Sequence, residues 1–323
     1  MKPSKLITAA AIAALALGAC GKNKDSKKKG PATTSSPKAT TESKQPTGMN
    51  PRLGAKKPEP PQTIGGFKTP ESVLYDADAD IYYVSNINGD PFGADDNGFI
   101  SKLTPEGKAE VWIDGAKPDV KLDAPKGMAL LGDLLYVADI TTVRMFDRKT
   151  GAPKGEVAIK GATFLNDLAA GKDVVYASDS GMLPGFKPSG TDAIYKIAGG
   201  KATAVIKDKD LGGPNGLALA GDDLWVVTFG SGELYKVTGG KKEGAVKPPK
   251  GQLDGLLVMG NGDVMISSWE AKAIYRGPTD GTKFAMAAKD LESPADIGWD
   301  GKRNRMLVPL FQKDQVAFVD ARP

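Results

Sequence analysis

The segment Gly213-Pro-Asn215-Gly-Leu-Ala-Leu219 is the clearest of six copies of one motif, in which a turn and a polar residue precede a short apolar run. We take Asn215 as the reference position of its repeat. The other five copies are Thr-Pro-Glu71-Ser-Val-Leu-Tyr, Ala-Pro-Lys126-Gly-Met-Ala-Leu, Phe-Leu-Asn166-Asp-Leu-Ala-Ala, Gln-Leu-Asp254-Gly-Leu-Leu-Val and Ser-Pro-Ala295-Asp-Ile-Gly-Trp. The reference positions are 39 to 55 residues apart, which is the length of a repeated supersecondary unit.

Each copy is followed by a turn and by further apolar runs. The second runs are Ile81–Ser85, Leu134–Ala138, Val174–Ser178, Leu224–Thr228, Val264–Ser268 and Met306–Leu310. The third runs are Phe99–Leu103, Val143–Phe146, Ala193–Ile197, Glu233–Val237, Ala273–Arg276 and Val316–Val319. Five copies have a fourth run, such as Glu110–Ile113 or Val157–Lys160. Short strands between frequent turns, without a long helical period, indicate an all-β fold.

Four strands in each of six repeats predict a six-bladed β-propeller over residues 63–323. The sixth repeat has only three strands before Pro323, while residues near Gln62–Phe67 precede the first repeat. We expect this N-terminal segment to supply the missing strand of the last blade, because that pairing removes an open sheet edge. An open β-sandwich is the rival architecture, and six in-phase copies fit it poorly.

The first 62 residues predict export and membrane anchoring. Residues 1–19 carry two lysines before an apolar run of 11 residues, which is too short to span a bilayer. Leu17-Gly-Ala-Cys20 resembles the bacterial lipobox, and Cys20 is the single cysteine of the chain. We therefore expect a lipoprotein signal peptide over 1–19, a lipid on Cys20 and a disordered tether over 20–62. An ordinary signal peptide with an incidental cysteine is the alternative.

The positive charge of the chain is concentrated near its N-terminus. Residues 1–57 hold 12 Lys and Arg against 2 Asp and Glu, which leaves 31 and 37 of the totals of 43 and 39 for residues 58–323, a net charge of −6. A basic stretch beside a lipid anchor is suited to an anionic membrane surface. An acidic globular part argues against nucleic acid as a partner. We expect a monomeric cell-envelope lipoprotein, on the periplasmic face of the outer membrane if the cell is Gram-negative.

In a propeller the reference residues stand where the innermost strands begin, beside the central channel. They should form a ring around one mouth, with the loops Asn86–Gly98 and Asp179–Asp192 on the same face. The ring comprises Glu71, Lys126, Asn166, Asn215, Asp254 and Ala295. Two carboxylates and two amide carbonyls suit one hard divalent cation, Ca²⁺ first and Mg²⁺ or Mn²⁺ next. The alternative for each residue alone is a turn role, since Asn and Asp are common in turns.

The chain has no histidine. That absence excludes a histidine zinc site and the Ser-His-Asp and Cys-His catalytic mechanisms. The hydrolytic chemistry that remains uses a cation to polarise a carbonyl or to activate water, with a carboxylate as the base.

The motifs Pro-Asn215-Gly-Leu-Ala, Phe-Leu-Asn166-Asp and Leu-Asp254-Gly-Leu, with Glu71 in the first repeat, resemble the senescence-marker-protein/gluconolactonase/luciferin-regenerating-enzyme family, which includes regucalcin. The resemblance spans about residues 64–323. It implies a six-bladed propeller with one divalent cation in the channel, and many members hydrolyse sugar lactones. It further implies that Glu71, Asn215 and Asp254 bind the metal, that Asn166 contacts metal or substrate, and that Asp254 or Asp167 is the general base.

Three functions follow as expectations. The first is a lipid-anchored, cation-dependent hydrolase of a small lactone or ester, in which Lys126 orients an anionic group or pairs with a carboxylate such as Asp254. The second is a non-enzymatic propeller that binds a protein or ligand at the envelope. The third is a cation-dependent phosphoester or organophosphate hydrolase with the same ring. Propellers host all of these, so the fold alone does not choose among them.

Overall fold

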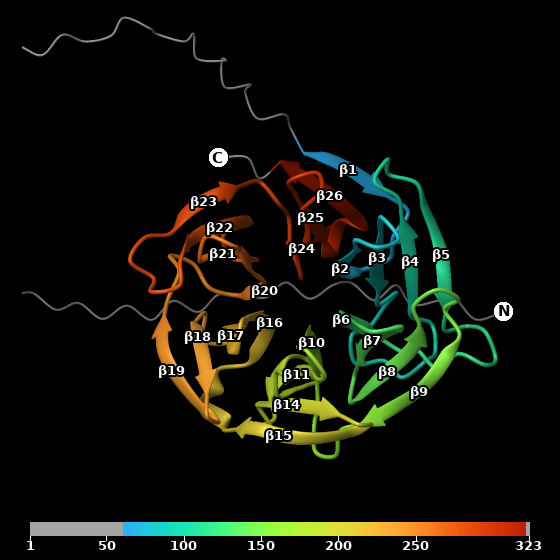
Figure 1. Cartoon of the computed structure of the whole chain (residues 1–323), viewed down its shortest axis with the longest axis horizontal. Helices are drawn as coiled ribbons and strands as arrows, with labels where there is room; N and C mark the ends of the chain where they lie inside the picture. Colours follow the sequence, from blue (N-terminus) through green and yellow to red (C-terminus); the bar gives the residue numbers. More distant parts are fainter. Residues whose placement is uncertain (1–60, 321–323) are drawn as a thin grey trace, which may run out of the picture. The chain divides into compact units, whose positions relative to one another are not determined.

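Residues 61–320, the part of the chain that the computed structural model describes, form six four-stranded antiparallel sheets arranged in a ring (Figure 1). The six-bladed β-propeller predicted from the repeats is confirmed. The expected signal peptide, the lipid on Cys20 and most of the tether lie outside the described residues.

Blades 1 to 3 follow one another along the chain, each with its innermost strand first. Blade 1 comprises β2 (Pro70–Asp76), β3 (Ile81–Asn86), β4 (Phe99–Leu103) and β5 (Ala109–Asp114). Blade 2 comprises β6 (Pro125–Leu131), β7 (Leu134–Asp139), β8 (Thr142–Asp147) and β9 (Pro153–Ala158). Blade 3 comprises β10 (Leu165–Ala170), β11 (Val175–Asp179), β14 (Ala193–Ala198) and β15 (Lys201–Lys207).

Blades 4 and 5 repeat this order, and blade 6 joins the two ends of the described chain. Blade 4 comprises β16 (Pro214–Ala220), β17 (Asp223–Thr228), β18 (Leu234–Thr238) and β19 (Lys241–Val246). Blade 5 comprises β20 (Leu253–Val258), β21 (Asp263–Ser268), β22 (Ala273–Pro278) and β23 (Ala285–Ala288). Blade 6 comprises β24 (Gly298–Asp300), β25 (Arg305–Leu310), β26 (Gln315–Asp320) and β1 (Gln62–Gly65).

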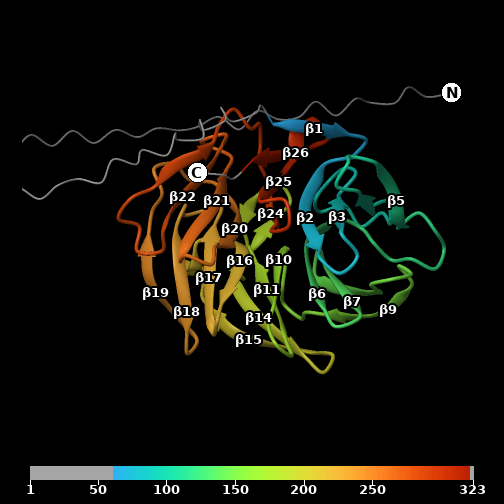
Figure 2. The ribbon, with the colours of Figure 1, turned by 45° about the horizontal axis from the view of Figure 1, so that its top comes forward.

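The ring closes through β1, as the sequence predicts. β1 runs antiparallel to β26, with Ile64 opposite Val316, and the two strands lie side by side in Figure 2. Ile64 and Phe67 are buried in an apolar cluster with residues of blades 1 and 6, including Tyr82 and Phe318. The N-terminal strand therefore covers the edge of β26 and contributes core side chains to the closure.

Every innermost strand from β2 to β20 carries a bulge at its reference residue. In β16, for example, Pro214 pairs with Thr228 and Leu217 pairs with Val226. The chain therefore advances three residues along β16 while its partner β17 advances only two. A bulge re-aims the side chain at that point. The glycine that follows Asn215 is needed for close packing, because a Cβ on Gly216 would lie 2.2 Å from the carbonyl oxygen of Asp254 in the next blade.

Two features differ from the sequence prediction. The fourth strand of blade 2 spans Pro153–Ala158, whereas Val157–Lys160 was predicted. The observed β9 is almost wholly exposed. An outermost strand is held mainly by backbone pairing, so the apolar residues of β9 do not mark where the strand begins and ends. The loop Asp179–Asp192 contains a short hairpin of β12 (Met182–Leu183) and β13 (Lys187–Pro188).

Helical structure is minimal in residues 61–320. It consists of two short 3-10 turns, η1 (Lys209–Leu211) and η2 (Phe311–Lys313). No helix in this part of the chain has the length and hydropathy needed to cross a membrane.

The closure predicts a measurable cost for Phe67→Ala. Phe67 is 1% exposed, and truncating a buried Phe destabilises a core by about 3–5 kcal/mol. Urea unfolding of the full chain should show this loss. Val111→Ala on β5, where Val111 is 57% exposed, is the control and should change stability by less than about 0.5 kcal/mol. Equal effects of the two substitutions would contradict the closure through the N-terminal segment.

Candidate metal centre

The six reference residues are buried, with none more than 6% exposed. Five begin their innermost strands within a bulge, and Ala295 lies just before β24. Adjacent blades are joined at this level: the backbone N–H of Asp296 donates to the carbonyl of Glu71 at 2.9 Å, which connects blade 6 to blade 1. The reference residues predicted to form a ring therefore occupy equivalent, buried positions in the six blades.

Serine hydroxyls on the second strands fix the bulges. Ser178 Oγ accepts from the backbone N–H of Asp167 at 2.9 Å and donates to the carbonyl of Asn215 at 2.7 Å. Ser267 Oγ likewise accepts from Gly255 N–H at 2.7 Å and donates to the carbonyl of Ala295 at 2.8 Å. Each serine connects a bulge in one blade to the next blade, so the reference residues are held by neighbouring sheets.

Four ring residues from four blades each have one buried oxygen without a hydrogen-bond partner. We call these atoms the oxygen set; they are Glu71 Oε2, Asn166 Oδ1, Asn215 Oδ1 and Asp254 Oδ1. An unsatisfied buried polar atom costs about 1–3 kcal/mol, and more when it is charged. Four such atoms at one repeat position fit a hard cation, which accepts this type of ligand.

The orientation of Asn166 is set by its amide nitrogen. Nδ2 donates to Ser180 Oγ at 3.2 Å, and Ser180 Oγ donates in turn to the carbonyl of Pro214 at 2.6 Å. Because the nitrogen is used in this way, the carbonyl oxygen is the atom left for a ligand.

Four buried carboxyl groups share the centre of the ring: Glu71, Asp167, Asp254 and Asp296. Burial raises the pKa of all four, and the charge of Asp296 raises those of Asp167 and Asp254 further. Desolvation raises the pKa of Asp296 itself to about 7. Both burial and like charge disfavour the ionised form, so a divalent cation would offset the same repulsion that raises these pKa values.

Lys126 does not pair with a ring carboxylate, contrary to one expectation from the sequence. Within residues 61–320 its Nζ donates to the carbonyls of Ala124 at 2.9 Å and Pro91 at 3.2 Å, and lies 4.4 Å from the ring centroid of Phe164. Desolvation lowers its pKa to about 8, against the attraction of Glu71. The loop carbonyl and the aromatic face hold the ammonium, which the repeat pattern could not reveal.

Asp167 and Asp254 differ as candidate bases. Asp167 accepts from the backbone N–H of Leu168 and of Leu217, both at 2.6 Å. Both of its oxygens are therefore engaged, and one of them joins blade 3 to blade 4. No backbone N–H in residues 61–320 engages the carboxylate of Asp254, and its Oδ1 belongs to the oxygen set. This makes Asp254 the better placed of the two for proton transfer.

Asp296 is the residue that the sequence interpretation missed. It follows Ala295, the one reference residue without a polar side chain, and it is 9% exposed with Oδ2 accepting from Ser72 Oγ at 2.5 Å. The position after the reference residue carries Asp twice, at Asp167 and Asp296. This recurrence of Asp at one repeat position could have identified Asp296 from the sequence.

The oxygen set combines carboxylate and amide oxygens. Residues 61–320 contain no group of three or more His, Cys, Asp and Glu side chains placed to hold a metal ion. Glu71 and Asp254 would supply two carboxylates, and Asn166 and Asn215 would supply two amide oxygens, a combination that Ca²⁺ accepts, with water or substrate completing the coordination.

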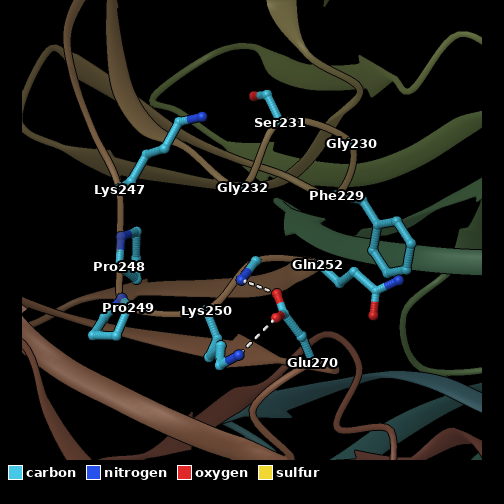
Figure 3. A pocket seen from close by; sticks show the side chains of 11 residues that line it. Phe229, Gly230, Ser231, Gly232, Lys247, Pro248, Pro249, Lys250, Gln252 and Glu270 are labelled. Atoms are coloured by element: carbon cyan, nitrogen blue, oxygen red, sulfur yellow. Dashed lines mark hydrogen bonds and ion pairs between the residues drawn. The ribbon is translucent and has the colours of Figure 1, made fainter. Parts of the chain in front are cut away.

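A groove of about 380 Å³ lies between blades 4 and 5 (Figure 3). Its lining includes Phe229 and Gln252, while Lys250 Nζ contacts Glu270 Oε1 at 3.1 Å. No ring residue lines it, so this groove is separate from the oxygen set.

Comparisons with known proteins support the architecture. No protein-family model matches the sequence, and no curated protein matches it. A provisionally assigned gluconolactonase has a TM-score of 0.63 at 15% identity, over 82% of this chain and 93% of its own. A gluconolactonase from Xanthomonas campestris has a TM-score of 0.61 at 15% identity, over 81% and 90%. Inactive virginiamycin B lyase from Staphylococcus aureus, solved with quinupristin, has a TM-score of 0.55 at 16% identity, over 81% and 99%. These similarities show the shared fold, in agreement with the resemblance seen in the sequence.

Asp254→Asn should change stability in opposite directions without and with metal. In EDTA at pH 8 the variant should be more stable than the wild type by about 1–2 kcal/mol, because a neutral amide replaces a buried, repelled carboxylate. At 100 times the Kd, a cation adds about 2.7 kcal/mol to the protein that binds it, so millimolar Ca²⁺ should reverse the order. Chemical unfolding in EDTA and in Ca²⁺ measures both differences.

Asp280→Asn is the matched control, since Asp280 is exposed in a turn between β22 and β23. It should respond to Ca²⁺ as the wild type does. The metal centre would be contradicted if Asp254→Asn were less stable than the wild type in EDTA. It would also be contradicted if Ca²⁺ stabilised the variant as much as the wild type.

Proposed function

We propose that this chain is a divalent-cation-dependent hydrolase of a small lactone or ester, anchored at the cell envelope through Cys20. The observation that carries the proposal is the oxygen set, four unpartnered buried oxygens from four blades at one repeat position. A propeller that serves only as a binding platform has no need to leave four such atoms without partners.

The oxygen set would hold the cation, with Ca²⁺ as the first candidate and Mg²⁺ or Mn²⁺ as the next. A cation bound there supplies polarisation of the substrate carbonyl and a lowered pKa for bound water. Glu71, Asn166, Asn215 and Asp254 fix its position from separate blades, so the arrangement is rigid before substrate arrives.

Asp254 is the proposed general base. Its Oδ1 belongs to the oxygen set, so its second oxygen, Oδ2, would take a proton from the water whose oxygen adds to the substrate carbonyl carbon. The carbon–oxygen bond of the ester or lactone then breaks, and the proton passes to the departing alkoxide, which leaves a carboxylic acid and a hydroxyl group. Lys126 would orient an anionic group of the substrate, and Asn166 would contact metal or substrate.

The phosphoester alternative is favoured by one observation, the buried cation of Lys126 in the ring. An anionic phosphoester would gain from that charge, whereas a neutral lactone gains less. Comparing aryl phosphoesters with carboxylic esters of the same leaving group separates the two candidates. The non-enzymatic alternative predicts turnover of neither.

Turnover should require both the cation and Asp254. We expect the full chain to hydrolyse members of a lactone and ester panel with Ca²⁺, Mg²⁺ or Mn²⁺, and EDTA to abolish the activity. Asp254→Asn should lower kcat by about 10²–10⁴, the usual contribution of a positioned base, whereas Asp280→Asn should leave it unchanged. Undiminished kcat in Asp254→Asn would show that the proposed base is wrong.

The anchor is tested separately from the site. Cells expressing the full chain with a labelled fatty acid should incorporate label, and globomycin should leave the signal peptide attached. Cys20→Ala should abolish incorporation and release the protein from the membrane fraction. Labelling that persists in Cys20→Ala would contradict lipidation at this residue.

A further inference from the structure

Three phenylalanines form a cluster above the ring. Phe92 lies in the loop between β3 and β4, Phe164 precedes β10, and Phe186 lies in the β12–β13 hairpin. Their ring centroids are 4.6 Å apart for Phe92 and Phe164, 5.4 Å for Phe92 and Phe186, and 6.5 Å for Phe164 and Phe186. We call these residues the Phe cluster.

The Phe cluster adjoins the ring and extends to solvent. Phe164 is 4% exposed and stands two residues before Asn166, with the Nζ of Lys126 over its face. Phe186 is 51% exposed. The cluster thus runs from a buried aromatic ring close to Asn166 in the sequence to an exposed one in the β12–β13 hairpin.

The fold itself does not require these aromatic side chains. The positions equivalent to Phe164 in the other repeats are small or polar: Thr69, Ala124, Gly213, Gln252 and Ser293. Phe186 has φ 57°, a conformation that is rare for a bulky residue. An exposed aromatic ring on a strained backbone is disfavoured in the free protein, which indicates a role in binding.

A second aromatic set lies in blades 4 to 6. Phe229, Trp269 and Phe311 each follow the last residue of the second strand, in blades 4, 5 and 6. Their neighbouring centroids are 5.6 and 5.1 Å apart. The Nε1 of Trp269 is buried without a hydrogen-bond partner in the part of the chain that the structure describes.

We propose that the Phe cluster holds the apolar body of the substrate, so that the preferred ligand is a lactone or ester with an aryl or long alkyl substituent and not a polyhydroxylated sugar lactone. The inference deepens the proposed function, because it places the carbonyl of the same substrate at the oxygen set. Apolar groups gain from contact with aromatic faces, whereas the hydroxyls of a sugar would be buried there without partners, which a site discriminates against strongly.

Non-hydrolysable lactams test the ligand class without any need for turnover. The probes are a phenyl-substituted δ-lactam and the δ-lactam of gluconic acid, titrated calorimetrically into the full chain with Ca²⁺. The phenyl lactam should bind at least about tenfold more tightly. Phe186→Ala should weaken its binding about fivefold and leave the gluconic lactam unchanged, and Phe186→Trp should restore the affinity.

Met286→Ala is the control, since Met286 is 56% exposed on β23, an outermost strand of blade 5. It should alter neither affinity. Equal or tighter binding of the gluconic lactam, no binding of either lactam, or no effect of Phe186→Ala would overturn the inference. Phenyl-lactam binding that depends on Phe186, in a protein that hydrolyses no lactone or ester, would support the ligand class while refuting the hydrolase.

Discussion

Repulsion among buried carboxyl groups dominates the centre of this propeller. Glu71, Asp167, Asp254 and Asp296 lie out of water around one channel, and burial raises the pKa of each. Lys126 attracts Glu71, but its ammonium is held by backbone carbonyls and an aromatic ring. The charge is therefore poorly balanced by the protein alone. A divalent cation on Glu71 and Asp254 would balance it, which is why the metal is central to the proposed chemistry.

The architecture keeps this unfavourable arrangement in place. The bulge at five of the six reference residues turns the side chain away from the regular sheet pattern, and glycines such as Gly216 allow neighbouring blades to approach closely. Hydroxyl bridges such as that of Ser178 connect one bulge to the next blade. The closure of the ring by β1 then removes the freedom by which the blades could separate and relieve the repulsion.

The blade pattern could be predicted from the sequence because each repeat contains the same apolar runs in the same order. The outermost strands were harder to place: β9 is exposed, so backbone pairing alone sets its limits. The ring positions were predictable for the same reason as the blades. The surroundings of Lys126 could not be predicted from the repeats. Pro91 reaches Lys126 from a loop, and Phe164 reaches it from the neighbouring blade. Asp296 was missed because it follows Ala295, a reference residue without a polar side chain.

Anomalous diffraction from crystals of the Mn²⁺-loaded protein tests the metal centre most directly. The account predicts one strong anomalous peak in the channel, within coordination distance of Glu71 Oε2, Asn166 Oδ1, Asn215 Oδ1 and Asp254 Oδ1, and loss of that peak on addition of EDTA. An empty channel at saturating Mn²⁺, or a peak bound only by surface carboxylates, would contradict the account.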